Sequence, residues 1–340
     1  MSQPEYDVII VGAGPAGIFA ALELTRTPGI RVLMLDKGPA LDQRQCPSRQ
    51  KGRCMQCATC ALMTGWGGSG AFSDGKLTLT TQVGGLLADI RGQDEAERLV
   101  EQVDDLWVRF GADGEPYSGD LDSIQEVAHK AALAGLRLQH YPIRHLGTER
   151  SGDILGAMYL ELVGRGVEVR TRTEVARILT ENGAVTGVET ARGQTLAAPH
   201  VIVAPGREGA DWLTKLARDL KLSLSINPVD IGVRVELPAH VLQPLTDLLY
   251  EPKFLYFSRS FDDRVRTFCV CPYGEVVTEW AGDVMTVNGH SYAHQRTENT
   301  NFALLVSKNF TEPFKEPIAY GKHIARLANL LSGGIMVQRL

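Results

Sequence analysis

The stretch Val8-Ile9-Ile10-Val11-Gly12-Ala13-Gly14-Pro15-Ala16-Gly17 decides the fold of this chain. Its four β-branched residues predict a buried parallel strand, and the glycines that follow lead directly into an alanine-rich helix. Gly12 permits a tight turn, Gly14 lets the backbone approach a pyrophosphate, and Gly17 lets helix and strand pack closely. The helix N-terminus supplies N–H groups and a positive dipole for phosphate. The stretch therefore predicts a dinucleotide-binding βαβ unit; the alternative is a glycine-rich turn without a ligand.

The nucleotide is indicated by residues further along the chain. Residues 31–35 predict the second strand, and Asp36 ends it. A carboxylate there is suited to accept hydrogen bonds from ribose hydroxyls, and it argues against the 2′-phosphate of NADP. Asn182-Gly183 predicts the turn of a β-meander, and the next strand ends in Ala204-Pro205-Gly206. This order is typical of two-dinucleotide-binding flavoproteins, so we expect FAD rather than NAD, with the Val175 backbone at the adenine.

The residues expected to bind the cofactor come from the glycine turn, the end of the second strand, a later glycine-rich loop, the start of the meander and the Ala-x-Gly strand end. They are Gly12, Gly14, Pro15, Ala16, Gly17, Asp36, Lys37, Gly67, Gly68, Ser69, Val175, Ala204 and Gly206.

Composition limits the class of protein and of partner. The chain has 340 residues, 44% of them hydrophobic, with a formal net charge of -5. This length predicts one elaborated domain or two. The charge gives no basic footprint, which argues against nucleic acid and favours a small-molecule substrate. We find no signal peptide and no apolar run of membrane-spanning length, so we expect a cytoplasmic protein without a membrane span.

The predicted fold class is α/β: a Rossmann-like FAD-binding domain with a β-meander, and a mainly antiparallel α+β second domain. Apolar spacing predicts helices over 94–110, 121–134, 154–162 and 210–220, and strands over 175–179, 184–189 and 201–204. The expected domains are a discontinuous FAD-binding domain over 1–90 and 140–222, a helical insertion over 91–139, an antiparallel sheet over 223–310, and a helical segment over 311–340.

Four of the six cysteines, Cys46, Cys54, Cys57 and Cys60, fall within fifteen residues. Their C-x7-C-x2-C-x2-C spacing leaves four interpretations open: an iron-sulfur cluster, a zinc site, a redox dithiol, or ordinary reduced thiols. Cys269 and Cys271 alternate in a predicted strand. Alternation places them on opposite faces, so we expect them to be core residues that form no close pair.

Several segments together resemble a known family. They are residues 12–17, the glycine-rich loop 65–77, His145-Leu146-Gly147-Thr148, residues 230–236 and residues 299–303. The chain resembles bacterial FAD-dependent dehydrogenases related to glutathione-reductase-type and geranylgeranyl-reductase-type flavoproteins. The resemblance implies that the loop lies beside the pyrophosphate and isoalloxazine. It also implies that the family's C-terminal part, with a closing strand and helix, is missing here, so that FAD would be bound weakly.

Four residues are candidates for chemistry near the flavin. Lys76 can stabilise negative charge on the reduced flavin and Asp74 can orient it, unless they form an ordinary turn and a solvated cation. His145 is a candidate proton donor or relay, or a structural hydrogen-bonding residue. Arg234 can clamp a substrate carboxylate, or pair with Glu236 on the same strand face.

The sequence thus predicts an FAD-dependent oxidoreductase that transfers hydride or electrons to or from an organic substrate of unknown identity. NAD(P)H as a transient donor and an electron-transfer protein as a partner fit this reaction class. The alternative is a catalytically silent flavin- or nucleotide-binding fragment of a larger flavoprotein.

Overall fold

The computed structural model describes residues 4–47, 54–72, 75–281, 283–292, 295–311 and 316–339. These residues fold as two compact units. The first comprises Met1–Phe72, Gly152–Leu224 and Trp280–Asp283, and the second comprises Ser73–Ser151, Ser225–Glu279 and Val284–Leu340. These boundaries differ from the expected domains, because residues 73–90 and 140–151 belong to the second unit.

The first unit is built on a parallel sheet that begins with the glycine-turn strand. Its strand order is β10-β1-β2-β6, with β10 at His200–Val203, β1 at Val8–Val11, β2 at Val32–Leu35 and β6 at Glu168–Arg170. Every residue of β1 and β2 is buried, which explains why their sequences are uninterruptedly apolar. The helices of this unit are α1 (Pro15–Leu24), α7 (Ala210–Asp219) and most of α6 (Thr148–Gly164).

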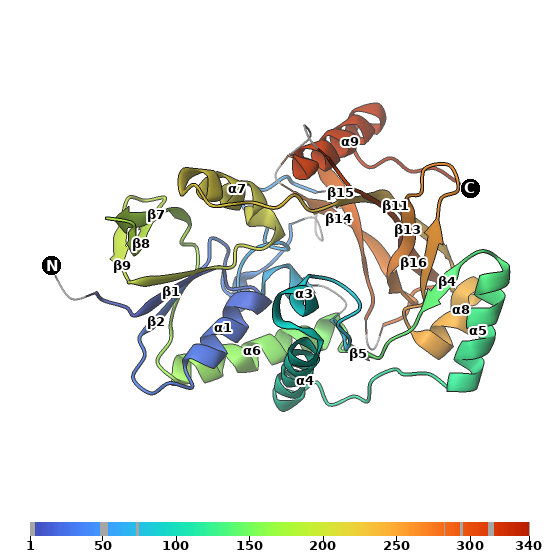
Figure 1. Cartoon of the computed structure of the whole chain (residues 1–340), viewed down its shortest axis with the longest axis horizontal. Coiled ribbons are helices and arrows are strands. Elements are labelled where there is room, and N and C mark those ends of the chain that lie inside the picture. The colour runs from blue at the N-terminus through green and yellow to red at the C-terminus, as the bar shows by residue number, and fades with distance from the viewer. Residues whose placement is uncertain are drawn as a thin grey trace. The chain divides into compact units, whose positions relative to one another are not determined.

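A three-stranded antiparallel meander completes the first unit (Figure 1). It consists of β7 (Val175–Glu181), β8 (Ala184–Thr190) and β9 (Thr195–Ala197). Asn182 and Gly183 have φ angles of 53° and 80°, as the predicted turn requires. Ile9, Leu33, Val188 and Leu196 share one buried core, so the sheet and the meander are packed together.

The second unit is organised around an antiparallel sheet of order β11-β16-β13-β12-β4. Its strands are β11 (Val229–Pro238), β16 (Asn299–Lys308), β13 (Arg264–Cys271), β12 (Lys253–Phe257) and β4 (Arg137–Gln139). Two further pairs join β3 (Lys76–Thr78) to β5 (Ile143–His145) and β14 (Glu275–Trp280) to β15 (Met285–His290).

Among the described residues, five α-helices lie wholly in the second unit (Figure 1). They are α3 (Leu87–Arg91), α4 (Gln93–Arg109), α5 (Leu121–Leu133), α8 (Ala239–Leu249) and α9 (Pro317–Ser332). The expected insertion over 91–139 is more than helical, because its last residues form β4 and extend the sheet beside β12. No pattern in the sequence predicted α8, which contains Pro244. Proline disfavours a helix interior, and α8 packs against β11 and β16.

One sequence expectation is wrong in the second unit. The register of β13 against β16 shifts between Phe268 and Cys271, and Cys269 has a left-handed φ of 48°. A bulge of this kind re-aims side chains. It brings the Cys269 and Cys271 sulfurs to 3.8 Å, so they form the close pair that simple alternation excluded.

Lys253, on β12, is a buried cation. The residue is 4% exposed, and its ammonium lies 5.5 Å from the ring centroid of Tyr141 and 6.0 Å from that of Phe268. Burial, reinforced by the positive charge of Arg266, lowers the pKa of Lys253 from 10.5 to about 8, against the opposing effect of Glu251.

We expect Lys253→Met to remove a pH dependence of stability. The pKa is lower in the folded chain, so between pH 8 and 10.5 the unfolded chain binds more protons and wild-type stability rises with pH. Relative to Lys253→Met, the free energy of unfolding of the wild type should rise by up to about 3 kcal/mol across that window. Urea unfolding at several pH values measures it. Lys130→Met, on an exposed lysine of α5, is the control, and parallel curves for wild type and Lys253→Met would contradict the expectation.

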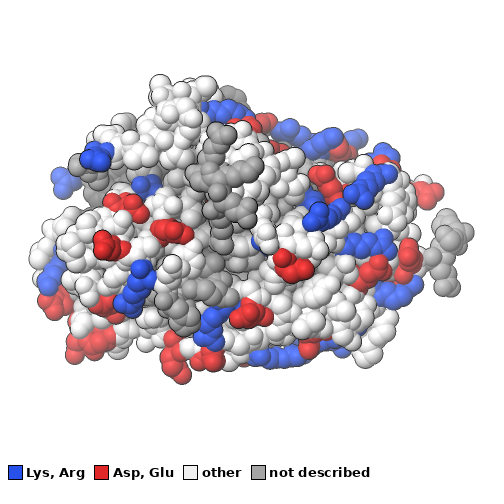
Figure 2. All heavy atoms as spheres, turned by 180° about the vertical axis from the view of Figure 1, so that it is seen from behind, with Lys and Arg blue, Asp and Glu red and all other residues white. Residues whose placement is uncertain are grey.

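On the face shown in Figure 2, Lys and Arg are interspersed with Asp and Glu, and neither sign forms a broad patch. Among the helices of the described residues, none is both long and apolar enough to cross a bilayer.

Candidate functional site

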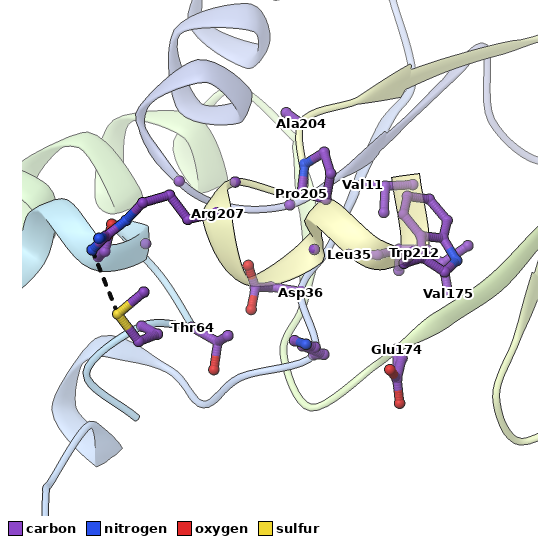
Figure 3. A pocket seen from close by; sticks show the side chains of 18 of the residues that line it. Val11, Leu35, Asp36, Thr64, Glu174, Val175, Ala204, Pro205, Arg207 and Trp212 are labelled. Carbon is purple, nitrogen blue, oxygen red and sulfur yellow. Dashed lines mark hydrogen bonds between the residues drawn. The ribbon is translucent and has the colours of Figure 1, made fainter. Parts of the chain in front are cut away.

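A pocket in the first unit lies at the carboxyl ends of β1, β2 and β10 (Figure 3). This is the edge at which open α/β sheets bind ligands. In the view of Figure 3, Trp212 and Val175 lie at one end, Arg207 at the other, and Asp36 between them. The pocket is lined by Val11, Gly12, Gly14, Pro15, Leu35, Asp36, Lys37, Met63, Thr64, Gly68, Ser69, Thr173, Glu174, Val175, Ala204, Pro205, Gly206, Arg207, Gly209 and Trp212.

Each glycine of the turn is required for a different structural reason. Gly12 has a φ of 106°, and a Cβ there would lie 2.1 Å from the Ala204 carbonyl oxygen. A Cβ on Gly17 would lie 2.0 Å from the Gly12 carbonyl oxygen. Gly14 is more open, since its nearest neighbour would be the Gly68 Cα at 3.7 Å. Gly12 and Gly17 therefore serve packing, while Gly14 leaves backbone exposed to the pocket at the start of α1.

Asp36 joins three loops of the pocket. One carboxylate oxygen accepts hydrogen bonds from the N–H groups of Gly38 (2.7 Å) and Gly65 (2.9 Å). The other accepts from the N–H of Ala13 (2.9 Å). A carboxylate has about four lone-pair positions, so roughly one remains for a ribose hydroxyl. The sequence predicted the ribose role for Asp36 but not this structural one.

The loop after the cysteines packs on the glycine turn. The Gly67 N–H donates to the Ala13 carbonyl at 2.7 Å, and a Cβ on Gly67 would lie 2.5 Å from a Leu155 methyl carbon. Gly67 is thus placed for packing and does not line the pocket, whereas Gly68 and Ser69 do. Of the other expected cofactor residues, exposed Ala16 and buried Gly17 also lie outside the lining.

Arg44 holds this loop in place, and sequence reasoning missed it. Its buried guanidinium donates to the carbonyls of Ala61 (2.8 Å), Leu62 (2.9 Å) and Trp66 (2.6 Å). Burial lowers the pKa of Arg44 to about 10, but the group stays charged at neutral pH. No local pattern distinguishes such an arginine from a surface one.

Two other lining residues form an ion pair or a hydrogen bond with neighbouring residues. Lys37 forms an ion pair with Glu208 (Nζ–Oε2 2.8 Å), and the Trp212 indole N–H donates to the Ala176 carbonyl at 2.9 Å. Both contacts fix side chains that border the pocket. Trp212 and Arg207 had no signal in the sequence, because they lie beyond the predicted Ala-x-Gly strand end.

The metal-site hypothesis stays a prediction. Within the described parts of the chain, no three Cys, His, Asp or Glu side chains are grouped as ligands, and residues 48–53 between Cys46 and Cys54 lie outside the description. Burial raises the pKa of Cys60, and Cys46 and Cys54 raise it further. The Cys60 carbonyl accepts hydrogen bonds from Met63 and Thr64, so its backbone shapes the pocket-lining loop.

The second unit contains Lys76 and His145, which pair across β3 and β5. Lys76 is buried, not solvated: its side chain is 7% exposed, its Nζ lies 2.7 Å from a Glu251 carboxylate oxygen, and it donates to the Val270 carbonyl at 2.8 Å. Asp74, its expected companion, lies outside the described residues.

His145 belongs to a hydrogen-bonded chain with Tyr250 and Ser291. The Tyr250 hydroxyl lies 2.7 Å from the His145 Nε2 and 3.1 Å from the Ser291 hydroxyl. Tyr250 and Ser291 are buried, and the His145 and Tyr250 rings are 4.4 Å apart. A phenol bridging an imidazole and a hydroxyl can move a proton along the chain. Sequence reasoning missed both partners, which are 105 and 146 residues from His145.

Arg234, half-buried on β11, meets neutral oxygens. Its guanidinium donates to the Cys269 carbonyl at 3.2 Å, to the Asn301 side chain, and to the Asn288 side chain at 3.4 Å. No ion pair of Arg234 occurs with any residue that the structure describes, Glu236 included. Among the described residues, the guanidinium is therefore held by neutral oxygens, and no carboxylate contacts it directly.

Comparison with known proteins assigns the family. Residues 7–284 match the model of the FAD dependent oxidoreductase family. The chain belongs to this family. FAD is therefore its cofactor, and the pocket fits a dinucleotide: Gly14 and Pro15 present the start of α1, Asp36 retains an acceptor position, and Gly206 has open space where a Cβ would stand.

Two curated proteins are similar in sequence to this chain. An uncharacterized protein of Clostridium beijerinckii is 27% identical over 344 residues, which cover 96% of this chain and 57% of that protein. A D-amino acid dehydrogenase of a Methylobacterium species is 40% identical over 124 residues, covering 35% of this chain and 28% of that protein. The chain therefore spans little more than half the length of the first relative.

A solved structure is also similar. Glycine oxidase from Bacillus cereus aligns with 98% of this chain and 81% of its own, at 16% identity and a TM-score of 0.43. The expected kinship with glutathione-reductase-type and geranylgeranyl-reductase-type flavoproteins stays a prediction.

Proposed function

We propose that this chain is an FAD-dependent oxidoreductase that acts on a small organic substrate bearing a carboxylate, and that Arg234 binds that carboxylate. The observation that carries the proposal is that, among the described residues, the Arg234 guanidinium contacts neutral oxygens and no carboxylate. A half-buried guanidinium without an acidic partner is costly to maintain, and a planar carboxylate is the ligand that its fork fits best.

FAD would be held by the first unit. In this proposal the start of α1 at Gly14 and Pro15 receives the pyrophosphate, the free acceptor position of Asp36 receives a ribose hydroxyl, and Val175 and Trp212 border the adenine. Gly68, Ser69 and Gly206 approach the cofactor through their backbones. The bound flavin supplies the hydride or electron transfer.

The substrate class is supported by the second unit and by one relative. Asn288 and Asn301 accept hydrogen bonds from Arg234 and so fix the direction in which its fork points. A relative is named a D-amino acid dehydrogenase, a name that places a carboxylate on its substrate. We propose that the substrate of this chain also carries a carboxylate, and that Arg234 binds it.

Proton movement would be handled by the chain of His145, Tyr250 and Ser291. Oxidation of a C–H next to nitrogen or oxygen releases a proton that needs an acceptor, and His145 can hold one at a ring nitrogen. Lys76, fixed by Glu251, would supply positive charge. NAD(P)H or an electron-transfer protein remains a candidate second partner of the reaction.

We expect Arg234→Gln to lower kcat/KM for carboxylate substrates by roughly 10² to 10³-fold, as for loss of a charge-assisted bidentate contact. Anaerobic bleaching of the bound flavin by a panel of amino acids and 2-hydroxy acids, each beside its carboxamide, measures the effect. The wild type should prefer the acids, and Arg234→Gln should lose that preference while keeping its flavin.

Arg264→Gln is the control, because Arg264 lies on β13 of the same sheet and its guanidinium donates to the Ser307 hydroxyl at 3.5 Å. Equal preference for acids and amides in the wild type would contradict the carboxylate clamp. A protein whose flavin is never bleached by any member of the panel, but is bleached by dithionite, would favour the catalytically silent flavin-binding alternative.

A further inference from the structure

The bulge of β13 brings two thiols together in the second unit. The Cys269 and Cys271 sulfurs are 3.8 Å apart, and both residues are unbridged. The closeness depends on the left-handed backbone at Cys269 (φ 48°), a conformation that costs a non-glycine residue about 1 kcal/mol or more. The fold thus holds the two side chains together at an energetic cost to the backbone.

A positive charge lies next to one of the sulfurs. The Lys76 Nζ is 3.9 Å from the Cys269 Sγ, and an ammonium beside a sulfur stabilises its thiolate. Glu251 holds both parts of this arrangement. One of its carboxylate oxygens accepts from the Cys269 N–H at 2.9 Å, and the other pairs with Lys76 at 2.7 Å.

The two thiols differ in access. Cys271 is completely buried and closely enclosed, since a Cβ on Gly289 would lie 2.8 Å from its sulfur and a Cβ on Gly274 3.0 Å from its Cβ. Cys269 is half-buried. An external reagent can therefore reach Cys269 before Cys271, which suits Cys269 as the attacking thiol and Cys271 as the resolving one.

We propose that Cys269 and Cys271 are a redox-active dithiol that closes reversibly to a disulfide by exchange with a low-molecular-weight disulfide. The Cys269 thiolate attacks one sulfur of the reagent and releases one thiol. The Cys271 sulfur then attacks Cys269 in the mixed disulfide and releases the second thiol. The protein loses two electrons and two protons, and the reagent disulfide gains them as two thiols.

Closure of this disulfide would shift the backbone of Cys269, which contacts two charged side chains of the same unit. The Cys269 carbonyl accepts from Arg234 at 3.2 Å, and the Cys269 N–H donates to Glu251. A bond between the sulfurs must draw them about 1.8 Å closer to reach the usual disulfide length of about 2.05 Å. The backbone of Cys269 lies between the moving sulfur and these two contacts.

Glutathione redox buffers test the proposal on the full chain. The protein is equilibrated at a series of ratios of reduced to oxidised glutathione, and its thiols are then blocked with iodoacetamide. The mass of the tryptic peptide 267–296 is measured by mass spectrometry. This peptide contains Cys269 and Cys271 and no other cysteine. In reducing buffer, we expect the peptide to carry two alkyl groups. In oxidising buffer, we expect it to carry none and to be lighter by two hydrogens than the unalkylated dithiol peptide. Dithiothreitol followed by iodoacetamide should restore the doubly alkylated form.

Matched variants separate this pair from the other thiols and from misfolding. A variant with Cys46, Cys54, Cys57 and Cys60 all changed to Ser should still form the disulfide, whereas Cys271→Ser should stop at a glutathione adduct on Cys269. Lys76→Gln should slow closure by about tenfold, because less thiolate is available, with an unchanged far-UV spectrum as the folding check. A peptide that stays doubly alkylated in every buffer, or that carries two glutathiones instead of one internal bond, would overturn the proposal.

Discussion

Asp36→Ala is expected to abolish stable FAD binding. Its carboxylate accepts three backbone hydrogen bonds, from Ala13, Gly38 and Gly65, and each buried donor left without an acceptor costs about 1 to 3 kcal/mol. Losing all three loosens the glycine turn and the loop at Gly65 together. We expect FAD affinity to fall by at least roughly 100-fold, read as flavin released per chain after denaturation.

Two further variants make this result specific. Asp36→Asn keeps one acceptor oxygen, so it should retain the contacts of one oxygen and give intermediate flavin content. Asp7→Ala is the matched control: Asp7 also accepts from a backbone N–H, that of Arg31 at 2.8 Å, but it is exposed. Full flavin in Asp36→Ala would show that the three hydrogen bonds do not shape the pocket.

Gly12→Ala is expected to have the second large effect, on flavin content and stability together. The added Cβ would lie 2.1 Å from the Ala204 carbonyl oxygen. A Cβ is fixed rigidly to its own backbone and the carbonyl oxygen is part of the backbone, so neither atom can move away independently. We expect the free energy of unfolding to fall by about 3 kcal/mol or more, and β1 and β10 to separate near the pocket. Thermal unfolding and released flavin measure it.

Gly29→Ala separates close packing from backbone conformation. Gly29 also has a positive φ, 79°, but a Cβ there would meet nothing within 4 Å. The substitution should therefore cost only the about 1 to 2 kcal/mol of a left-handed alanine and leave flavin content unchanged. Similar losses in both variants would mean that φ, and not contact with Ala204, makes glycine necessary at position 12.

The fold of the nucleotide-binding part could be predicted well because its signals are local. A short apolar strand, a glycine turn and an alanine-rich helix occupy consecutive residues, and each dictates its own conformation. The meander turn at Asn182-Gly183 was predicted for the same reason, since its positive φ values suit these two residue types. By contrast, α8 was missed, because packing against the sheet outweighs its internal Pro244.

The candidate site could be predicted only in part. The sequence placed Asp36 at the end of β2, but its bonds to Ala13 and Gly65 depend on how three loops meet. It also proposed His145 and Arg234 as candidates, without their partners. Gly67 was expected to bind cofactor, yet its neighbours Leu155 and Ala13 place it in the packing between loop and turn.

The sequence by itself determined the βαβ unit, the family's cofactor class and the antiparallel character of the second unit, since short-range periodicity and glycine positions encode these features. Only the tertiary structure decided that Tyr250 bridges His145 and Ser291, that Arg234 faces neutral oxygens, and that a bulge joins Cys269 to Cys271. These contacts link residues on segments far apart in the sequence, or reverse the local alternation of one strand. Their energies arise only when the sheet pairs and its register is set.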